Sequence, residues 1–189
     1  MFADIALLLL AAGRGQRFGG RKLGAILGGE PVLYHSARML GRLPFAHRIA
    51  TVGATTPDLG PLGFGMVELA DAGSTMSASI AAGIAAIRQR DVSAAMICLG
   101  DMPFVPAAHI HRMIEAFDGD RLASISAGRR MPPALFARAH FGALEGLSGD
   151  RGASALLAGA PAIELSPDEA LDIDTPEDLA RAVAILGRA

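Results

Sequence analysis

Short apolar runs alternate with helix-like segments along most of the chain, and this alternation constrains the fold more than any other feature. Runs bounded by glycine or proline are typical of buried strands, and here they are Ile5–Leu10, Arg48–Val52, Met66–Leu69 and Ala94–Leu99. Helices are predicted at Pro31–Leu40, Met76–Arg90 and Pro106–Phe117. Such alternation predicts a Rossmann-like, three-layer α/β/α fold with a mostly parallel sheet covered on both faces.

The chain after Phe117 is less regular. Leu122–Ser126 and Ala162–Leu165 are predicted as strands, and Arg129–Phe136 as an extended segment that two prolines interrupt. Asp150–Leu157 is predicted as a helix because an acidic residue that can cap it comes first.

The clearest helix signal lies at the end, at Pro176–Leu186. Thr175 is a capping residue, proline suits the first helical position, and acidic residues follow in the first turn. We find no repeat, low-complexity tract or flexible linker, and therefore expect a single domain over residues 1–189.

The composition excludes several classes of protein. With 189 residues and 51% hydrophobic content, the chain can build one core on both sides of a sheet. Its formal net charge of −2 attracts neither nucleic acid nor an anionic membrane, so we expect neither as a partner. No apolar stretch reaches the roughly 18 to 20 residues that span a bilayer. The single cysteine, Cys98, rules out an internal disulfide, and a cytoplasmic location is expected.

A glycine-rich segment with three arginines and a lysine follows the first predicted strand. In Ala11–Lys22, glycines let backbone amides approach an anion closely, and the cationic side chains supply positive charge. The segment lacks the Lys-Ser or Lys-Thr pair of a Walker A loop and the third glycine of a dinucleotide fingerprint. It favours a triphosphate as ligand, with an ordinary strand-to-helix connection and solvated arginines as the alternative.

Asp101 follows the predicted strand Ala94–Leu99 in the turn Gly100-Asp-Met-Pro103. Ligands of open parallel sheets gather at the carboxyl ends of the strands, and Mg²⁺ is usually held by one or two carboxylates together with phosphates and water. Asp101 is therefore a candidate Mg²⁺ ligand, while a simple turn-capping role is the alternative.

The segment before the last helix, Asp172-Ile-Asp174, supplies two more carboxylates. If it is extended, both carboxylates lie on one side while Ile173 faces the core. Capping of the last helix is already satisfied by Thr175, so it does not explain these residues. We expect Asp174 to be a second contact for the metal or for an acceptor.

Five ordered motifs resemble the nucleotide-diphospho-sugar transferase superfamily. They are Leu10-Ala-Ala-Gly13 with Arg17 and Lys22, Gly73 to Ser79, Leu99 to Pro103, Gly149-Asp-Arg-Gly152, and Asp172 to Asp178. Together they are most similar to molybdenum cofactor cytidylyltransferases and cover nearly the whole chain. The resemblance implies transfer of CMP from CTP to the terminal phosphate of molybdopterin, with release of pyrophosphate.

The resemblance also implies roles for individual residues. Arg17, Lys22 and Asp101 would be catalytic. Nucleotide binding would involve Leu10, Ala11, Ala12, Gly13, Arg17, Lys22, Gly73 and Ser79, although Gly73 and Ser79 could also mark a plain helix start. Residues 1–105 would form the nucleotide-binding part and roughly 118–170 the acceptor-binding part. The sequence Ala11-Ala12-Gly13 resembles the cytidylyl branch, whereas guanylyltransferases of this group tend to have Ala-Gly-Gly, so CTP is favoured over GTP.

The acceptor side departs from the family pattern. Where relatives usually have a Gly-His-Pro-like turn, this chain has Met131-Pro132-Pro133. Arg129, Arg130 and Asp150 are candidate contacts for the acceptor phosphate, with solvated arginines and a capped turn as alternatives. A guanylyltransferase, a nucleotidyltransferase acting on a sugar or polyol phosphate, and a non-catalytic molybdopterin carrier stay open. A molybdoenzyme or its chaperone is the expected protein partner.

Overall fold

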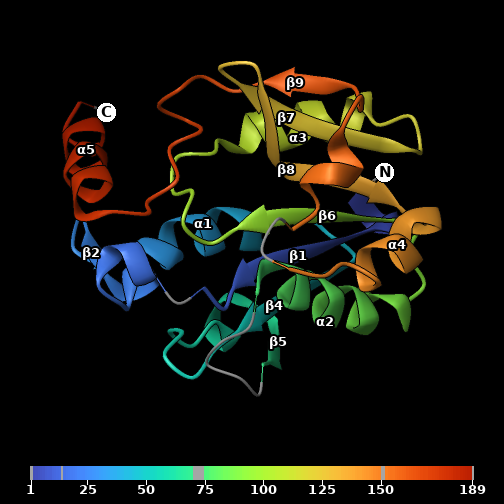
Figure 1. The fold of residues 1–189 in the computed structure, drawn as a ribbon, viewed down its shortest axis with the longest axis horizontal. Helices are drawn as coiled ribbons and strands as arrows, with labels where there is room; N and C mark the ends of the chain where they lie inside the picture. Colours follow the sequence, from blue (N-terminus) through green and yellow to red (C-terminus); the bar gives the residue numbers. More distant parts are fainter. Residues whose placement is uncertain (1, 14, 70–74, 150–151, 189) are drawn as a thin grey trace.

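The computed structural model describes residues 2–13, 15–69, 75–149 and 152–188. Within these ranges the chain forms a seven-stranded sheet with the strand order β5-β4-β1-β6-β8-β7-β9 (Figure 1). The strands of this sheet are β1 Ile5–Ala11, β4 His47–Val52, β5 Gly65–Glu68, β6 Ala94–Leu99, β7 Arg121–Ser126, β8 Arg129–Ala137 and β9 Ala162–Glu164. A separate two-stranded hairpin consists of β2 Ile26–Leu27 and β3 Glu30–Pro31.

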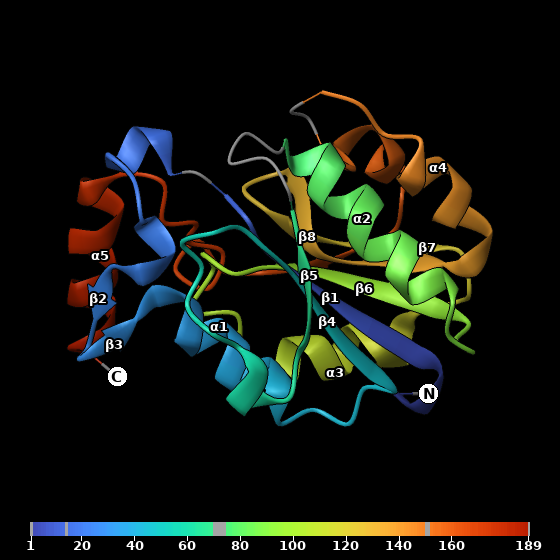
Figure 2. The same ribbon diagram turned by 90° about the horizontal axis from the view of Figure 1, so that it is seen from below.

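Helices cover both faces of the sheet, as predicted (Figure 2). Helices α1 Val32–Gly41 and α3 Ala107–Ala116 pack on one face, and α2 Met76–Arg88 and α4 Phe141–Glu145 pack on the other. Short 3-10 helices connect these elements at Phe2–Asp4, Gln16–Phe18, Lys22–Gly24, Gly60–Leu62, Arg138–His140 and Ser154–Leu157. None of the helices in the described ranges is long and apolar enough to cross a membrane.

Strand β1 lies at the centre of this arrangement, and all seven of its residues are buried. Leu7 and Leu9 belong to the core under α1 and α3, whereas Leu8 belongs to the core under α2. A Cβ added at Gly83 of α2 would lie 2.3 Å from a methyl carbon of Leu8, so this helix lies directly on the strand. The continuous apolar run therefore reflects burial on both faces of the sheet.

The second half of the sheet contains the antiparallel pairs. β8 runs antiparallel to both β6 and β7, while β9 is parallel to β7. The segment with Pro132 and Pro133 is part of β8, and a cis peptide bond joins the two prolines. The predicted helix Asp150–Leu157 is wrong over its described part, which forms only the 3-10 turn Ser154–Leu157. Gly152 has a φ of +55°, which a right-handed α-helix does not accommodate.

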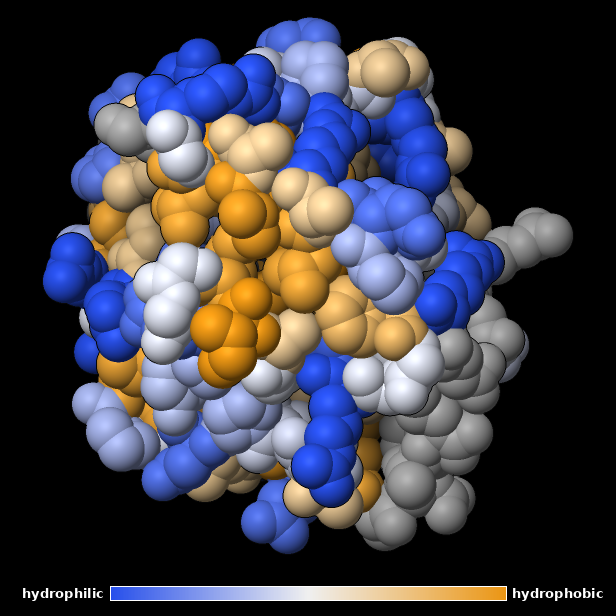
Figure 3. All heavy atoms as spheres, turned by 90° about the vertical axis from the view of Figure 1, so that its left-hand side faces the viewer, coloured by the Kyte–Doolittle hydropathy of each residue, from blue (hydrophilic) through white to orange (hydrophobic). Residues whose placement is uncertain are grey.

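The last helix, α5 Pro176–Leu186, stands apart from the main layers and packs with the β2–β3 hairpin (Figures 1 and 2). Their shared apolar cluster consists of Leu27, Val32, Leu171, Ile173 and Ala182. Apolar residues also gather on the outer face of this unit, shown in Figure 3, where Ile26 of β2 is 59% and Val183 of α5 is 52% exposed. This packing joins the segment after the first glycine-rich loop to the end of the chain.

A buried polar chain connects α3 to β7 and β8. The Ser124 hydroxyl donates to the carbonyl of Pro133 (2.8 Å), so its oxygen accepts from Nε2 of His109 (2.8 Å). Nδ1 of His109 is then free to accept from the Arg112 guanidinium (3.3 Å). Burial and the charge of Arg112 lower the pKa of His109 to about 4, so the imidazole is neutral and both of its nitrogens are satisfied.

Protonation of this histidine should reduce stability in mild acid. Because the ordinary pKa of 6.5 falls to about 4 on folding, the unfolded chain gains a proton first, and stability is lost as pH falls between these values. In urea titrations from pH 7 to pH 4, the free energy of unfolding should fall by about 2 kcal/mol less in His109→Gln than in the wild type. His111→Gln, an exposed position on the same helix, should keep the wild-type profile. Parallel profiles for His109→Gln and wild type would contradict the neutral-imidazole assignment.

Candidate active site

Three segments that are distant in sequence meet at the carboxyl ends of β1 and β6. The amide of Gly100, directly after β6, donates to the carbonyl of Leu10 in β1 (3.0 Å). The amide of Ile173 donates to the carbonyl of Asp101 (3.1 Å), which brings the segment before α5 to the same place. A Cβ at Gly100 would lie 2.6 Å from a methyl carbon of Leu33 and 3.2 Å from the carbonyl oxygen of Leu10, so the absence of a side chain lets the turn pass closely here. The predicted sheet edge is therefore where the candidate residues come together.

Asp101, Asp172 and Asp174 form a carboxylate cluster at this edge. One oxygen from each carboxylate lies within 4.8 Å of the others, and no other such group of metal-ligand side chains occurs in the described part of the chain. Oδ1 of Asp101 and Oδ1 of Asp172 are buried and have no hydrogen-bond partner among the described residues. Burial and the charge of Asp101 raise the pKa of Asp172 to about 7. Buried oxygens without donors suit a cation as their missing partner.

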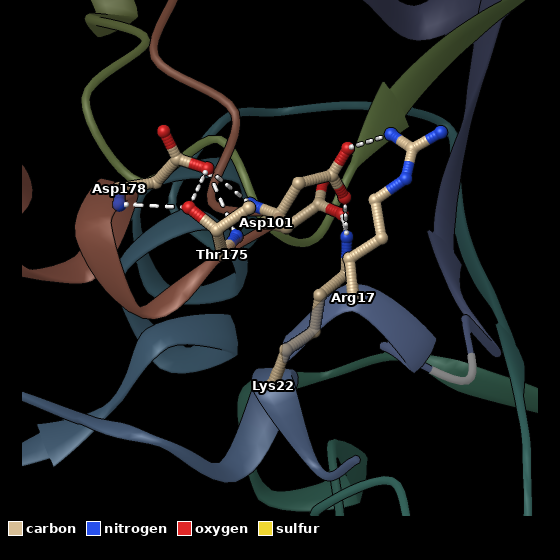
Figure 4. A network of polar contacts seen from close by, with 6 residues as sticks. Arg17, Lys22, Asp101, Thr175 and Asp178 are labelled. Atoms are coloured by element: carbon tan, nitrogen blue, oxygen red, sulfur yellow. Dashed lines mark hydrogen bonds and ion pairs between the residues drawn. The ribbon is translucent and has the colours of Figure 1, made fainter. Parts of the chain in front are cut away.

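Lys22 points into the carboxylate cluster (Figure 4). Its Nζ lies 2.5 Å from Oδ2 of Asp101 and 2.7 Å from Oδ1 of Asp174. Burial disfavours the ammonium, but the charge of Asp101 and hydrogen bonds to both carboxylates outweigh it and raise the pKa of Lys22 above its ordinary value. Arg17 reaches the cluster from solvent, at 3.5 Å from Oδ2 of Asp174 with a side chain 81% exposed. Only Lys22 is therefore held firmly there.

The glycine-rich segment holds the lysine by close backbone packing. The carbonyl of Gly15 accepts from the amides of Phe18 and Gly20, both at 2.9 Å, which closes the loop into a compact turn. Gly15 has a φ of +58°, and a Cβ there would lie 3.0 Å from Cγ of Lys22. Any side chain at Gly15 would be strained and would press on the lysine stem. The glycine is required for the position of Lys22.

The segment after β4 contacts the end of β1 at Ala11 and Ala12. The Thr56 hydroxyl donates to the carbonyl of Ala11 (2.6 Å) and accepts from the amide of Gly53 (3.0 Å). A Cβ at Gly53 would lie 3.6 Å from the carbonyl oxygen of Ala12. Sequence reasoning missed Thr56 and Gly53, and no local signal could have revealed them because the contact spans more than forty residues.

The start of α5 fixes Asp174. Thr175 and Asp178 form the capping box that the sequence predicts, with each side chain bound to the other's backbone amide. Oδ2 of Asp178 also accepts from the amide of Asp174 (3.1 Å). A small desolvation cost is outweighed by the hydrogen bonds from Thr175 and from these amides, which lower the pKa of Asp178. The helix cap thus anchors a residue of the carboxylate cluster.

The structure brings some of the predicted site residues together and leaves others outside the cluster. It brings Arg17, Lys22, Asp101 and Asp174 together and adds Asp172, which the Asp-Ile-Asp alternation had signalled without a role being assigned. Ser79 is buried in α2, and its hydroxyl donates to the Thr75 carbonyl (3.1 Å), as in a plain helix start. Gly73 and Asp150 lie outside the described residues.

On the acceptor side, the two arginines differ. β8 begins at the edge of the sheet where β6 ends, because the two strands are antiparallel, and Arg129 is exposed there as the first residue of β8. Arg130 instead donates through Nε to the carbonyl of Ala160 (2.7 Å), so its side chain ties β8 to the segment before β9. Beside them is an apolar recess lined by Leu10, Met76, Ile80, Pro132, Phe136 and Leu157.

Asp178→Ala should weaken the anchor of Asp174. Loss of the capping box should lower the free energy of unfolding by about 1 kcal/mol in urea titration. Glu177→Ala removes an exposed acidic residue from the same turn and should cost less than half as much, because Glu177 contributes only to the helix dipole. Equal losses in the two variants would show that Asp178 acts through its charge alone.

Comparison with known proteins agrees with this geometry. A family model described as the MobA-like NTP transferase domain matches residues 7–167. The molybdenum cofactor guanylyltransferase of Rhodobacter capsulatus is 30% identical over 187 residues, which cover 94% of each chain. A bifunctional enzyme IspD/IspF of Rhizorhabdus wittichii is 38% identical over 122 residues, 61% of this chain, and the match spans about a third (31%) of that longer relative.

The fold agrees equally well with a solved structure. The crystal structure of the Mycobacterium tuberculosis rv0371c homolog from Mycobacterium sp. strain JC1 superimposes with a TM-score of 0.83. The two chains are 26% identical, and the match covers 100% of this chain and 99% of the other. With the family model spanning most of its length, the chain belongs to the family of proteins that have a MobA-like NTP transferase domain.

Proposed function

We propose that this protein is a nucleotidyltransferase that transfers CMP from CTP to the terminal phosphate of molybdopterin and releases pyrophosphate. The observation that carries the proposal is the meeting of Lys22 and Arg17, from the glycine-rich loop, with three carboxylates at the carboxyl edge of the sheet. A triphosphate bound on the loop would place its α-phosphorus close both to the cationic side chains and to the carboxylates. A molybdopterin carrier without catalytic activity would have no need of this combination.

The carboxylates are the residues that would hold a divalent cation, which we propose is Mg²⁺. Asp101 and Asp174 are the ligands expected from the sequence, and the unpartnered oxygen of Asp172 makes it a third. When bound, the ion would neutralise charge on the phosphate oxygens. Oxygen donors at this spacing fit Mg²⁺, which prefers carboxylates together with phosphate and water.

The remaining chemistry belongs to the side chains of this chain. An oxygen of the acceptor phosphate attacks the α-phosphorus in line, the bond to the bridging oxygen of the β-phosphate breaks, and pyrophosphate leaves. The acceptor phosphate is already anionic, so no general base is required. Lys22 and Arg17 would stabilise the charge that develops on the oxygens of the α-phosphate and the leaving group, and the loop would fix their positions.

CTP is favoured by the side chain at position 12. Ala12 carries a methyl group at the position where the guanylyltransferases similar to this chain tend to have glycine. The Thr56 hydroxyl binds the carbonyl of Ala11, the residue before Ala12, which supports the position of the backbone that carries this methyl group. GTP is the second candidate, because the Rhodobacter capsulatus relative, which matches nearly the full chain, is a guanylyltransferase.

For the acceptor, we propose the cleft between residues 1–105 and roughly 118–170. The apolar recess is lined by Leu10, Met76 and Ile80 from the first part and by Pro132, Phe136 and Leu157 from the second. Exposed Arg129 at the start of β8 is available for the acceptor phosphate, whereas Arg130 donates to the carbonyl of Ala160 in the segment before β9. The recess has a volume of only about 30 Å³, so a ring system would lie against its apolar side chains and not inside it, and a sugar or polyol phosphate is the alternative acceptor. A molybdoenzyme or its chaperone would receive the product.

Nucleotide transfer can be tested directly with α-labelled CTP, GTP, ATP and UTP. In the presence of Mg²⁺ and molybdenum-loaded molybdopterin, we expect a CMP adduct to form preferentially, identified by its mass. A GMP adduct would assign the second candidate. Transfer to a sugar or polyol phosphate instead of molybdopterin would overturn the acceptor assignment while keeping the reaction.

Removal of one charge from the carboxylate cluster should affect turnover much more than binding of the acceptor. Asp101→Asn and Asp174→Asn should each lower kcat by about 100-fold or more. Each variant lacks a carboxylate that would hold the divalent cation, and the negative charge that develops on the phosphate oxygens is then less well neutralised. Asp168→Asn is the matched control, since Asp168 is an exposed carboxylate whose ion-pair partners among the described residues are Arg181 and Arg188, and the kcat of this variant should stay within about threefold of the wild type. Wild-type turnover in Asp101→Asn would contradict the role of the cluster.

A further inference from the structure

Lys22 lies where a cation bound by the carboxylate cluster would lie. Its Nζ is 2.5 Å and 2.7 Å from oxygens of Asp101 and Asp174, the same two side chains that the sequence predicts as metal ligands. It is also the only lysine in the 189-residue sequence, in which every other cationic side chain apart from histidine is arginine. A lysine presents a compact point charge, which fits between two carboxylates much as a metal ion does.

A divalent cation cannot enter this cluster without disturbing Lys22. The ammonium is buried, with Lys22 only 7% exposed, and its partner Asp101 has a side chain that is 15% exposed, so this ion pair is poorly screened by solvent. A metal ion would repel the ammonium and compete for the same oxygens. Leaving the lysine buried without a counter-ion is costly, because a broken buried pair leaves an uncompensated charge. The metal can therefore bind the carboxylates only if another anion pairs with the ammonium of Lys22.

The glycine-rich loop offers the place for that anion. The lysine stem runs along the loop, since a Cβ at Gly13 would lie 3.9 Å from Cε and a Cβ at Gly15 would lie 3.0 Å from Cγ. Phosphate oxygens bound on this loop would be within reach of Nζ after rotation about the end of the side chain. Arg17 cannot take the lysine's place in the cluster, because it is exposed and reaches only Asp174, at 3.5 Å.

We propose that Lys22 keeps divalent cations out of the Asp101–Asp172–Asp174 cluster until the phosphates of a nucleotide draw the ammonium onto the glycine-rich loop. The inference rests on the proposed function for its use of a nucleoside triphosphate. Metal and nucleotide then bind cooperatively, and each tightens the binding of the other by the same factor. Lys22 thus couples the two ligands in addition to stabilising charge during transfer.

The test is binding of Mn²⁺ alone, measured from the electron paramagnetic resonance signal of the free ion. Lys22→Met keeps the length of the stem but removes the charge, and it should bind Mn²⁺ about tenfold more tightly than the wild type, or better. Arg21→Met removes the same charge from the adjacent exposed residue and should change the affinity by less than about threefold. If Lys22→Met binds Mn²⁺ no more tightly than Arg21→Met does, the proposal is overturned.

Lys22→Arg and a measurement on the wild-type protein complete the test. Lys22→Arg restores the charge and should restore weak binding of Mn²⁺ alone, and affinity equal to that of Lys22→Met would contradict the proposal. Because the chain has one lysine, selective ¹³Cε-lysine labelling gives a single side-chain signal. That signal should stay in place with Mg²⁺ alone and move with Mg²⁺ and the α,β-methylene analogue of CTP or GTP. Movement with Mg²⁺ alone to the same position would overturn the proposal even if the variants do not fold.

Failure of the proposed function has a different signature. If neither nucleotide analogue binds to the wild-type protein with Mg²⁺ present, nucleotidyl transfer from CTP or GTP is excluded. The comparison of Lys22→Met with Arg21→Met in Mn²⁺ alone still decides whether the lysine keeps the cation out.

Discussion

The contact on which the site depends is the pair of ion bridges that the buried ammonium of Lys22 makes with Asp101 and Asp174. It joins the start of the chain, the end of β6 and the start of α5, which are separated by up to 152 residues. A buried pair adds little net stability but is costly to break, so it specifies geometry more than it stabilises the fold. Here it ties Asp174, just before α5, to Asp101 at the sheet edge, while the apolar cluster with the β2–β3 hairpin holds the helix itself.

Backbone packing makes this convergence possible. Gly100 allows the turn after β6 to pass against Leu33, and Gly15 allows the loop to close around the lysine stem. In both places the neighbouring atoms occupy space that a side chain on the glycine would fill. The capping box of Thr175 and Asp178 then holds the backbone of Asp174. A rigid frame of this kind can hold like charges close together, at the cost of the raised pKa of Asp172.

Local pattern was a good guide where the structure is regular. The strand Ile5–Leu10 and the helix Pro176–Leu186 were predicted to within about one residue, because burial on both faces and a capping box leave strong local signals. The prediction of a helix at Asp150–Leu157 is wrong over its described part, because Gly152 takes a left-handed conformation at a place where Met76 leaves no room for a Cβ. Arg130 was expected to face an acceptor, but it binds the carbonyl of Ala160, a partner thirty residues away.

The sequence by itself determined the layered α/β fold and the chemical types at the sheet edge: the glycine-rich loop with Arg17 and Lys22, then Asp101, then the Asp-Ile-Asp segment. These follow from periodicity, turn chemistry and the tendency of parallel strands to gather ligands at their carboxyl ends. Only the tertiary structure decided that Lys22 pairs with two of the carboxylates, that Asp172 joins them, and that Thr56 fixes Ala11. These contacts join residues distant in the chain, and their distances depend on how the segments pack, which no local pattern encodes.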